Sequence, residues 1–335
     1  MLLRFLSDSR LPTAIFIFLI AFVLWLPGFL SPETTAFYYP VKPMPLYELF
    51  AGMMMGNVLL SKIIAFIFIL FQAFLVVRLN GKFILIQERT FLPAFFFILL
   101  VSFYFPHLQF SRYLFGSLAV LIMLDVLLSS YKSDPNSWRF FEAGLILGVA
   151  SLFYARMIYF FPFIWISQLI LRPFFWREWI LPIVGVIVPA FIVVAIRYLT
   201  GADPWAIWDI FYDNLNNFYF SFRFILPYII ISSYIFLLVI IASGYMLRVY
   251  QFRKIYIRNY YLAFFWLFLL SSTLFTFLTR FDPGIVYASA IPVSFLLSNY
   301  FINARKSRGN RLLFILLILI FLGNGLNHLF GWLNI

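Results

Sequence analysis

The chain has 335 residues, of which 64% are hydrophobic and 11% are charged, whereas a soluble domain has roughly 45–50% apolar and about 25% charged residues. This composition excludes a water-soluble fold, and the net charge of +12 lies in short basic clusters between apolar runs, which indicates membrane topology and not nucleic-acid binding. The lack of cysteine excludes disulfides and thiolate zinc sites, and two histidines, His107 and His328, are too few for a histidine-rich metal centre.

The first apolar run extends from Leu11 to Leu30 and follows Arg4 and Arg10, as a signal sequence would. It is longer than the apolar core of a typical signal peptide, and it lacks a cleavage site of small residues. We therefore predict an uncleaved signal anchor that forms the first transmembrane helix.

The remaining apolar runs are read against a hydrocarbon core about 30 Å thick, which needs roughly 20 apolar residues per helix. We predict an all-α, polytopic transmembrane bundle that forms a single domain over residues 1–335. It contains about eleven helices, near residues 11–31, 58–77, 90–106, 113–130, 139–154, 156–171, 179–199, 225–247, 260–279, 285–302 and 312–332.

The basic residues orient this bundle, because Lys and Arg in short loops favour the cytoplasmic side. With the N-terminus inside, 17 of the 24 Lys and Arg residues fall on that side. Eleven spans then place the C-terminus outside. The sequence predicts a multi-pass protein of the bacterial inner membrane, with a cytoplasmic N-terminus and a periplasmic C-terminus.

Two long loops, over about residues 31–57 and 200–224, fall on the outer side, and both combine acidic with aromatic residues. Such a composition is typical of amphipathic helices at the membrane interface. We expect substrate contacts from these loops, with Tyr38 in the first and Trp205, Asp209 and Asp213 in the second.

Three outer arginines, Arg112, Arg156 and Arg280, are candidates for phosphate binding. Topology disfavours cations on this side, and the planar guanidinium group donates two parallel hydrogen bonds to an oxyanion. Arg156 and Arg280 fall in tight turns between predicted helices. The alternative interpretation is that each arginine snorkels from the membrane to the interface.

Two outer glutamates are candidate catalytic acids or bases. Glu33 follows the first predicted helix by three residues, so it would lie close to the outer membrane surface, where a carboxylate can bind a divalent cation or act as a general base. Glu48 is the second candidate. The alternative is that both are solvated loop carboxylates.

Asp125 and Glu142 fall inside predicted helices, where an ionised group costs about 2.5–3.5 kcal/mol at the helix centre on insertion scales. We expect both to approach the cytoplasmic interface and to pair with Lys132 and Arg139.

Two segments carry a resemblance to a known superfamily. Residues 140–201 contain a Gly-x-x-x-Gly span, a basic outer turn and an apolar span ending in Arg, followed by a span that closes on Tyr and Gly; these are Gly144, Gly148, Arg156, Arg172, Tyr198 and Gly201. Residues 279–301 add Arg280, Tyr287 and Pro292. Together with the long first outer loop, this pattern resembles the GT-C membrane glycosyltransferases. That family's first loop usually carries an Asp, whereas this loop begins with Pro32-Glu33.

The resemblance implies a GT-C-like fold and a polyprenyl-phosphate or polyprenyl-diphosphate sugar as the donor. An acceptor hydroxyl would attack the anomeric carbon at the outer face, with Glu33 as the base, helped or replaced by Glu48. Arg112, Arg156 and Arg280 would hold the leaving phosphate. A divalent cation is the one cofactor that this chemistry suggests, and membrane lipid is the expected environment.

Two other classes of function stay open. One is a flippase or transporter for a lipid-linked precursor, and the other is a non-catalytic scaffold or assembly subunit with envelope protein partners. The chain also resembles an uncharacterised family of Bacteroidota inner-membrane proteins through Pro45-Leu46-Tyr47-Glu48, a likeness that implies no function.

Overall fold

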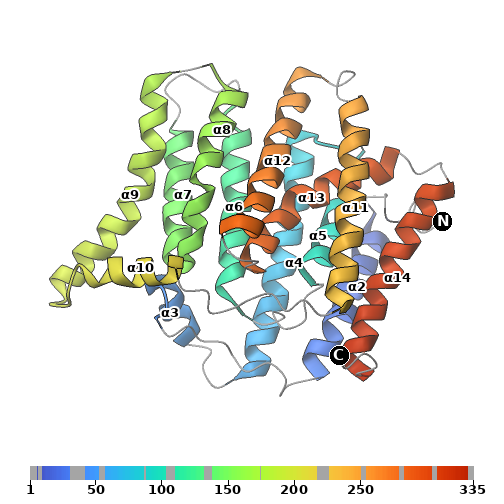
Figure 1. The fold of residues 1–335 in the computed structure, drawn as a ribbon, viewed down its shortest axis with the longest axis horizontal. Helices are drawn as coiled ribbons and strands as arrows, with labels where there is room; N and C mark the ends of the chain where they lie inside the picture. Colours follow the sequence, from blue (N-terminus) through green and yellow to red (C-terminus); the bar gives the residue numbers. More distant parts are fainter. Residues whose placement is uncertain are drawn as a thin grey trace.

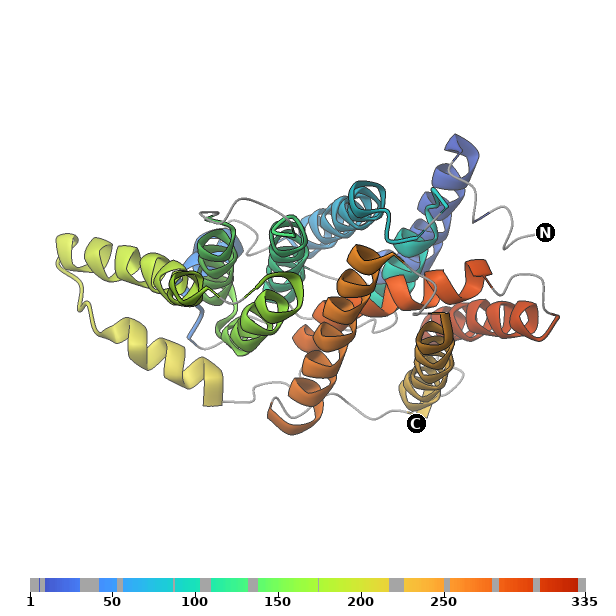
Figure 2. The ribbon, with the colours of Figure 1, turned by 90° about the horizontal axis from the view of Figure 1, so that it is seen from above.

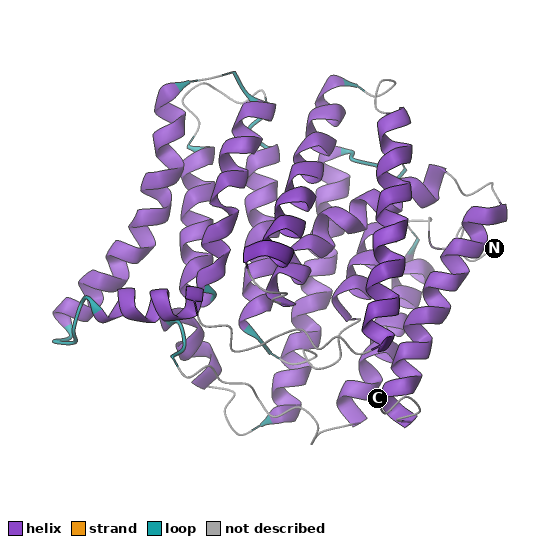
Figure 3. Ribbon diagram, viewed as in Figure 1, coloured by secondary structure: helices purple, strands orange, loops and turns teal. Residues whose placement is uncertain are grey.

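The computed structural model of the chain describes residues 6, 10–30, 42–52, 57–86, 88–102, 110–131, 138–173, 175–216, 226–249, 254–278, 283–303 and 308–330. All regular secondary structure in these ranges is helical (Figures 1 and 3). The α-helices are α2 (Leu11–Leu30), α3 (Pro45–Gly52), α4 (Val58–Phe83), α5 (Leu92–Ser102), α6 (Arg112–Leu128), α7 (Arg139–Phe153), α8 (Phe161–Leu171), α9 (Trp176–Leu199), α10 (Ala206–Asn216), α11 (Leu226–Val249), α12 (Ile255–Thr273), α13 (Pro283–Asn303) and α14 (Arg308–Phe330). A 3₁₀ helix, η2 (Ala155–Phe160), precedes α8, and a π-helix, η4 (Leu274–Leu278), follows α12.

Each of the eleven predicted ranges contains a helix. Five helices in the described part of the chain are long and apolar enough to cross a membrane: Leu11–Leu30, Val58–Phe83, Trp176–Leu199, Ile255–Thr276 and Gly284–Asn303. This set is compatible with a multi-pass membrane protein. The other apolar helices are shorter; α5, with 11 residues, is roughly 17 Å long at 1.5 Å per residue, so a count of eleven membrane crossings stays a prediction.

The helices of the bundle run side by side between two ends of the molecule (Figure 1). α10 lies across the lower end in this view, close to α3. From above, α9 and α10 lie at one side of the bundle, and α2, α11 and α14 lie at the other (Figure 2). The two segments predicted as outer loops therefore contain helices at the same end of the bundle.

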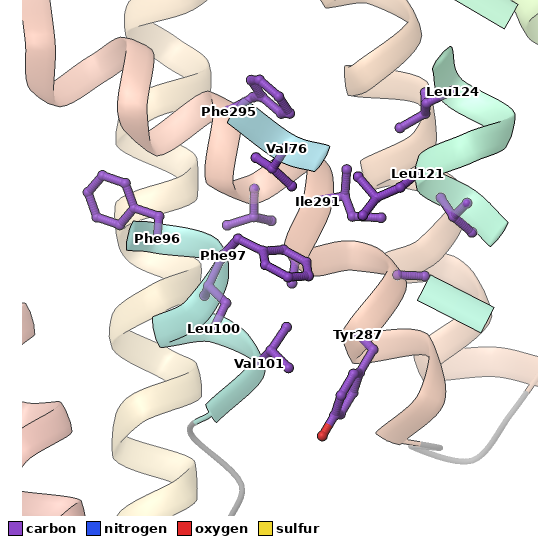
Figure 4. Packing of buried hydrophobic residues seen from close by; sticks show 14 of the residues in the cluster. Val76, Phe96, Phe97, Leu100, Val101, Leu121, Leu124, Tyr287, Ile291 and Phe295 are labelled. Atoms are coloured by element: carbon purple, nitrogen blue, oxygen red, sulfur yellow. The ribbon is translucent and has the colours of Figure 1, made fainter. Parts of the chain in front are cut away.

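Large apolar side chains fill the centre of the bundle. Phe96, Phe97 and Leu100 of α5 pack with Ile291 and Phe295 of α13 (Figure 4). α13 is buried along most of its length, and it contacts α5, α6, α11 and α12. It is thus a central helix, around which these four helices pack.

Some polar side chains inside the bundle form hydrogen bonds to neighbouring helices. Lys62 of α4 is 3% exposed and donates to the carbonyl oxygen of Gly28 in α2. Residue 32 is a proline without an N–H, so this carbonyl has no regular helical donor four residues on. Lys62 therefore joins α4 to the end of α2 and satisfies a backbone group in an apolar setting, where an unsatisfied group costs several kcal/mol.

Two ion pairs lie at the end of the bundle opposite α3 and α10. Arg172 at the end of α8 pairs with Glu178 of α9, both almost fully buried, and Arg172 also donates through Nε to the Ser130 carbonyl at 2.9 Å. Asp125 of α6 pairs with Lys82 of α4. The residue expected to pair with Asp125, Lys132, lies outside the described residues, and Glu142 is exposed in the first turn of α7.

α7 and α9 pack backbone against backbone. Gly144 and Gly148 of α7 face Pro182 and Val186 of α9, and a Cβ at Gly148 would lie 2.8 Å from the Val186 carbonyl oxygen. Gly185 of α9 presses in turn against the Phe141 carbonyl. Small residues permit this close approach, as they do in helix pairs of membrane proteins. The Gly-x-x-x-Gly pattern therefore has a structural role.

We expect Gly185→Ala to lower the midpoint of thermal unfolding, because the added methyl group would overlap the backbone of α7, and overpacking typically costs about 1–3 kcal/mol. Gly244→Ala in α11 is the matched control, since no atom lies within 4 Å of a Cβ there. That control should leave the midpoint unchanged or raise it, because Ala favours helix over Gly by about 1 kcal/mol. Unfolding of purified protein in detergent measures both, and equal midpoints for the two variants would contradict the packing described.

Candidate anion-binding site

Arg112 is the first residue of α6, and it is only 8% exposed. Its guanidinium carbon lies 5.5 Å from the ring centroid of Tyr113 and 5.3 Å from that of Tyr154, so two aromatic faces stabilise the cation. Its Nη1 atom donates to Oδ1 of Asn214 at 3.3 Å. Arg112 is thus a buried cation held by residues from three separate segments.

Arg156 lies in η2, in the junction between α7 and α8, and is 2% exposed. α7 ends at Phe153, and Tyr154 is extended (φ −146°, ψ 99°), so the chain reverses within a few residues. Tyr154 contacts Arg112 and precedes Arg156 by two residues. The structure therefore places two of the three predicted arginines at the same end of the bundle: Arg112 lies against the Tyr154 ring, and Arg156 follows Tyr154 by two residues in the chain.

The first turn of α13 closes the same region. A Cβ at Gly284 would lie 2.8–2.9 Å from the ring and hydroxyl of Tyr154, so a side chain at this position would displace the tyrosine. Tyr287, one turn later, lies 6.2 Å from Tyr113 between ring centroids. Arg280, the third predicted arginine, precedes this turn and lies outside the described residues.

The two predicted outer loops contact each other beside this site. Nδ2 of Asn214 in α10 donates to the Lys42 carbonyl at 2.8 Å, and Asp213 forms an ion pair with Lys42. The ion pair is solvent-exposed, and such pairs contribute about 0–1 kcal/mol, so the buried Asn214 is the stronger tie. Asn214 thus connects α10, the segment before α3, and Arg112.

α3 packs its aromatic face on the ends of α6 and α7. Tyr47 stacks on Phe110, and Phe50 lies 5.6 Å from Phe115 and 5.7 Å from Phe153 between ring centroids. Glu48 lies on the exposed side of this helix, next to the buried Tyr47. α3 therefore packs beside the segment that holds Tyr154 and Arg156, while the Glu48 side chain faces outward.

The other predicted site residues divide into two groups. Trp205 and Asp209 are exposed; Trp205, at 70%, directly precedes α10, and Trp208 and Tyr212 form an exposed aromatic face on that helix. That face is directed away from Asn214 and the arginines. Glu33 and Tyr38 lie outside the described residues, as does any cation site that Glu33 would form.

Asn214, Tyr113 and Tyr154 belong to this site although the sequence interpretation did not select them. Asn214 had a signal: helical spacing places it on one face with Ile207, Ile210 and Phe211, as the single polar residue on an otherwise apolar side. A polar residue at such a position predicts a specific hydrogen-bond partner. No comparable local pattern marks the tyrosines.

Acidic and histidine side chains form no group of three or more suited to a metal ion in the ranges that the structure describes. Comparison with family models, with curated proteins and with solved structures gave no match for this chain. The arrangement itself is two buried arginines at one end of the bundle, one of them against two tyrosine rings, and it suits an anion with an organic substituent.

We expect Asn214→Ala to speed amide hydrogen exchange over residues 206–216, because α10 loses its hydrogen bonds to Lys42 and Arg112. Removing a partner of a buried polar group costs about 1–3 kcal/mol, which corresponds to roughly 5- to 150-fold faster exchange where α10 opens locally. Asn216→Ala, at the exposed end of the same helix, should leave the exchange rates unchanged. Equal rates in both variants would show that Asn214 does not hold α10.

Proposed function

We propose that the chain is a membrane glycosyltransferase that binds the phosphate of a polyprenyl-linked sugar donor at the Arg112–Arg156 site. The observation that carries this proposal is the burial of two guanidinium groups at one end of an apolar bundle, beside two helices rich in aromatic residues. Arginine donates paired hydrogen bonds to phosphate oxygens, and a site of low dielectric strengthens this attraction.

In the proposed reaction, the acceptor hydroxyl oxygen forms a bond to the anomeric carbon of the donor sugar. The bond from that carbon to the phosphate oxygen breaks, and its electron pair leaves with the phosphate. Arg112 and Arg156 stabilise the growing negative charge on the phosphate, and a carboxylate, Glu33 or Glu48, takes the hydroxyl proton. The Glu48 side chain is exposed, so an acceptor can reach it from water.

The site lies at the periplasmic face of the bacterial inner membrane in this proposal. The basic residues at the opposite end, including Arg172 and Arg177, support this orientation through the positive-inside rule. The exposed aromatic face of α10 supports it too, because Trp and Tyr favour the interface between lipid and water.

The transfer reaction is tested with purified protein in proteoliposomes and polyprenyl-phosphate donors that carry a radiolabelled sugar. Arg112→Gln and Arg156→Gln should each lower transfer at least tenfold, since donors to a developing oxyanion contribute about 10²–10³ in rate. Arg177→Gln, an exposed arginine at the opposite end, is the control and should retain full activity.

Unfolding midpoints separate loss of function from loss of fold in these variants. Transfer that persists in folded Arg112→Gln and Arg156→Gln proteins would overturn the assigned role. Donor binding without transfer, abolished by the same substitutions, would instead favour a flippase or a binding subunit.

The orientation is tested by single-cysteine labelling, for which the cysteine-free chain needs no prior substitution. Asp209→Cys in α10 should react with a membrane-impermeant maleimide in intact spheroplasts. Arg177→Cys should react only after the membrane is permeabilised. The reverse pattern would place the Arg112–Arg156 site in the cytoplasm and contradict a periplasmic reaction.

A further inference from the structure

A cavity of about 440 Å³ lies between α11, α12 with η4, and α13, with Leu100 of α5 at its base. It is distinct from the anion-binding site and shares no lining residue with it. Its volume lies in the lower half of the range of about 300–1,000 Å³ typical of small-molecule sites. The cavity is thus large enough for a ligand and too small for a complete two-chain lipid.

The cavity arises from the way in which two consecutive helices pack. α11 and α12 each contact α13 extensively, but they scarcely contact one another in the part of the chain that the structure describes. Viewed from above, the two helices lie apart on the same side of α13 (Figure 2).

Three of the six hydroxyl side chains that line the cavity donate to carbonyl groups of the same helical segment. Ser271 donates to the Phe268 carbonyl at 3.0 Å, Ser289 donates to the Val286 carbonyl at 2.8 Å, and Thr276 donates to the Ser272 carbonyl. No charged side chain is among the residues that line the cavity. Nine of the fifteen lining residues are apolar, so the walls are mainly hydrocarbon and suit an apolar ligand.

The mouth of the cavity is continuous with an apolar outer surface. Phe236 of α11 lines the cavity and is 62% exposed, and its neighbours Leu237 and Ile240 are exposed as well. Ala290 and Val293 of α13 lie buried on the inner wall. In a membrane, this mouth would face the lipid hydrocarbon directly.

We propose that this cavity binds one acyl chain of a membrane phospholipid. Phospholipid acyl chains make up most of the hydrocarbon next to a lateral opening, so mass action favours them over scarcer lipids. The volume fits one chain, while the phospholipid head group and second chain stay outside. The proposal requires a membrane-embedded bundle and does not depend on the glycosyltransferase activity.

The test uses proteoliposomes that contain a phospholipid with a photoreactive diazirine in one acyl chain, followed by mass spectrometry of the labelled peptides. Labelling of the cavity-lining residues of α11 and α13 should exceed, at least fivefold, that of the lipid-facing residues Ile187 and Phe191 of α9. Equal labelling of the two regions in the unaltered protein would overturn the proposal.

Ala290→Phe fills the cavity and should remove the label from its walls while leaving the α9 label unchanged. Ile67→Phe adds a similar ring on the exposed face of α4, a helix that does not line the cavity, and should change neither label. Val293→Phe, from the same wall, replaces Ala290→Phe if that variant fails to fold. Cavity labelling that persists in a folded filling variant overturns the proposal. A few per cent of polyprenyl phosphate that removes the cavity label from the unaltered protein also overturns it, because that result would assign the cavity to a prenyl chain.

Discussion

The structure depends on one constraint: a polar group inside an apolar bundle must find its partner within the protein. Lys62 satisfies a carbonyl at the end of α2, and Gln72 of α4 donates to the Leu114 carbonyl while accepting from Ser117, both in α6. Each bond joins helices that are otherwise held by apolar contacts. Apolar contacts have no preferred direction, so without these hydrogen bonds the helices could shift more easily relative to one another. The few polar residues therefore fix which helices meet and in what register.

The same constraint makes the Arg112–Arg156 site costly to build. A guanidinium group in a low-dielectric setting requires compensation, and the rings of Tyr113 and Tyr154 and the amide of Asn214 supply part of it for Arg112. These residues come from α6, the α7–η2 junction and α10, so the cation unites segments distant in sequence. A chain that needed only a stable bundle would gain more from apolar residues at these positions. The proposed binding of a phosphate at this site would account for retaining two cations there.

The sequence predicted those features that depend on neighbouring residues. Apolar runs located every long helix, with ends that differ by up to about six residues, as at Phe83 of α4, and Arg156 was correctly expected in a tight junction. Features that depend on tertiary contact escaped: Asp125 pairs with Lys82 from another helix, and Glu48 points outward because Tyr47 takes the inner face of α3. The tyrosines around Arg112 are unremarkable in sequence. Composition and periodicity encode burial, whereas the choice of partner is a property of the folded chain.

α13 contributes residues from two of its sides, one to the candidate anion-binding site and the other to the cavity. Gly284 and Tyr287 lie on the side that meets Tyr113 and Tyr154, whereas Ser289, Ala290 and Val293 lie on the side that lines the cavity. Because α13 is buried along most of its length, its first turn cannot shift toward one site without changing the other. An acyl chain in the cavity would therefore hold Gly284 against Tyr154 and stabilise the wall of the anion-binding site.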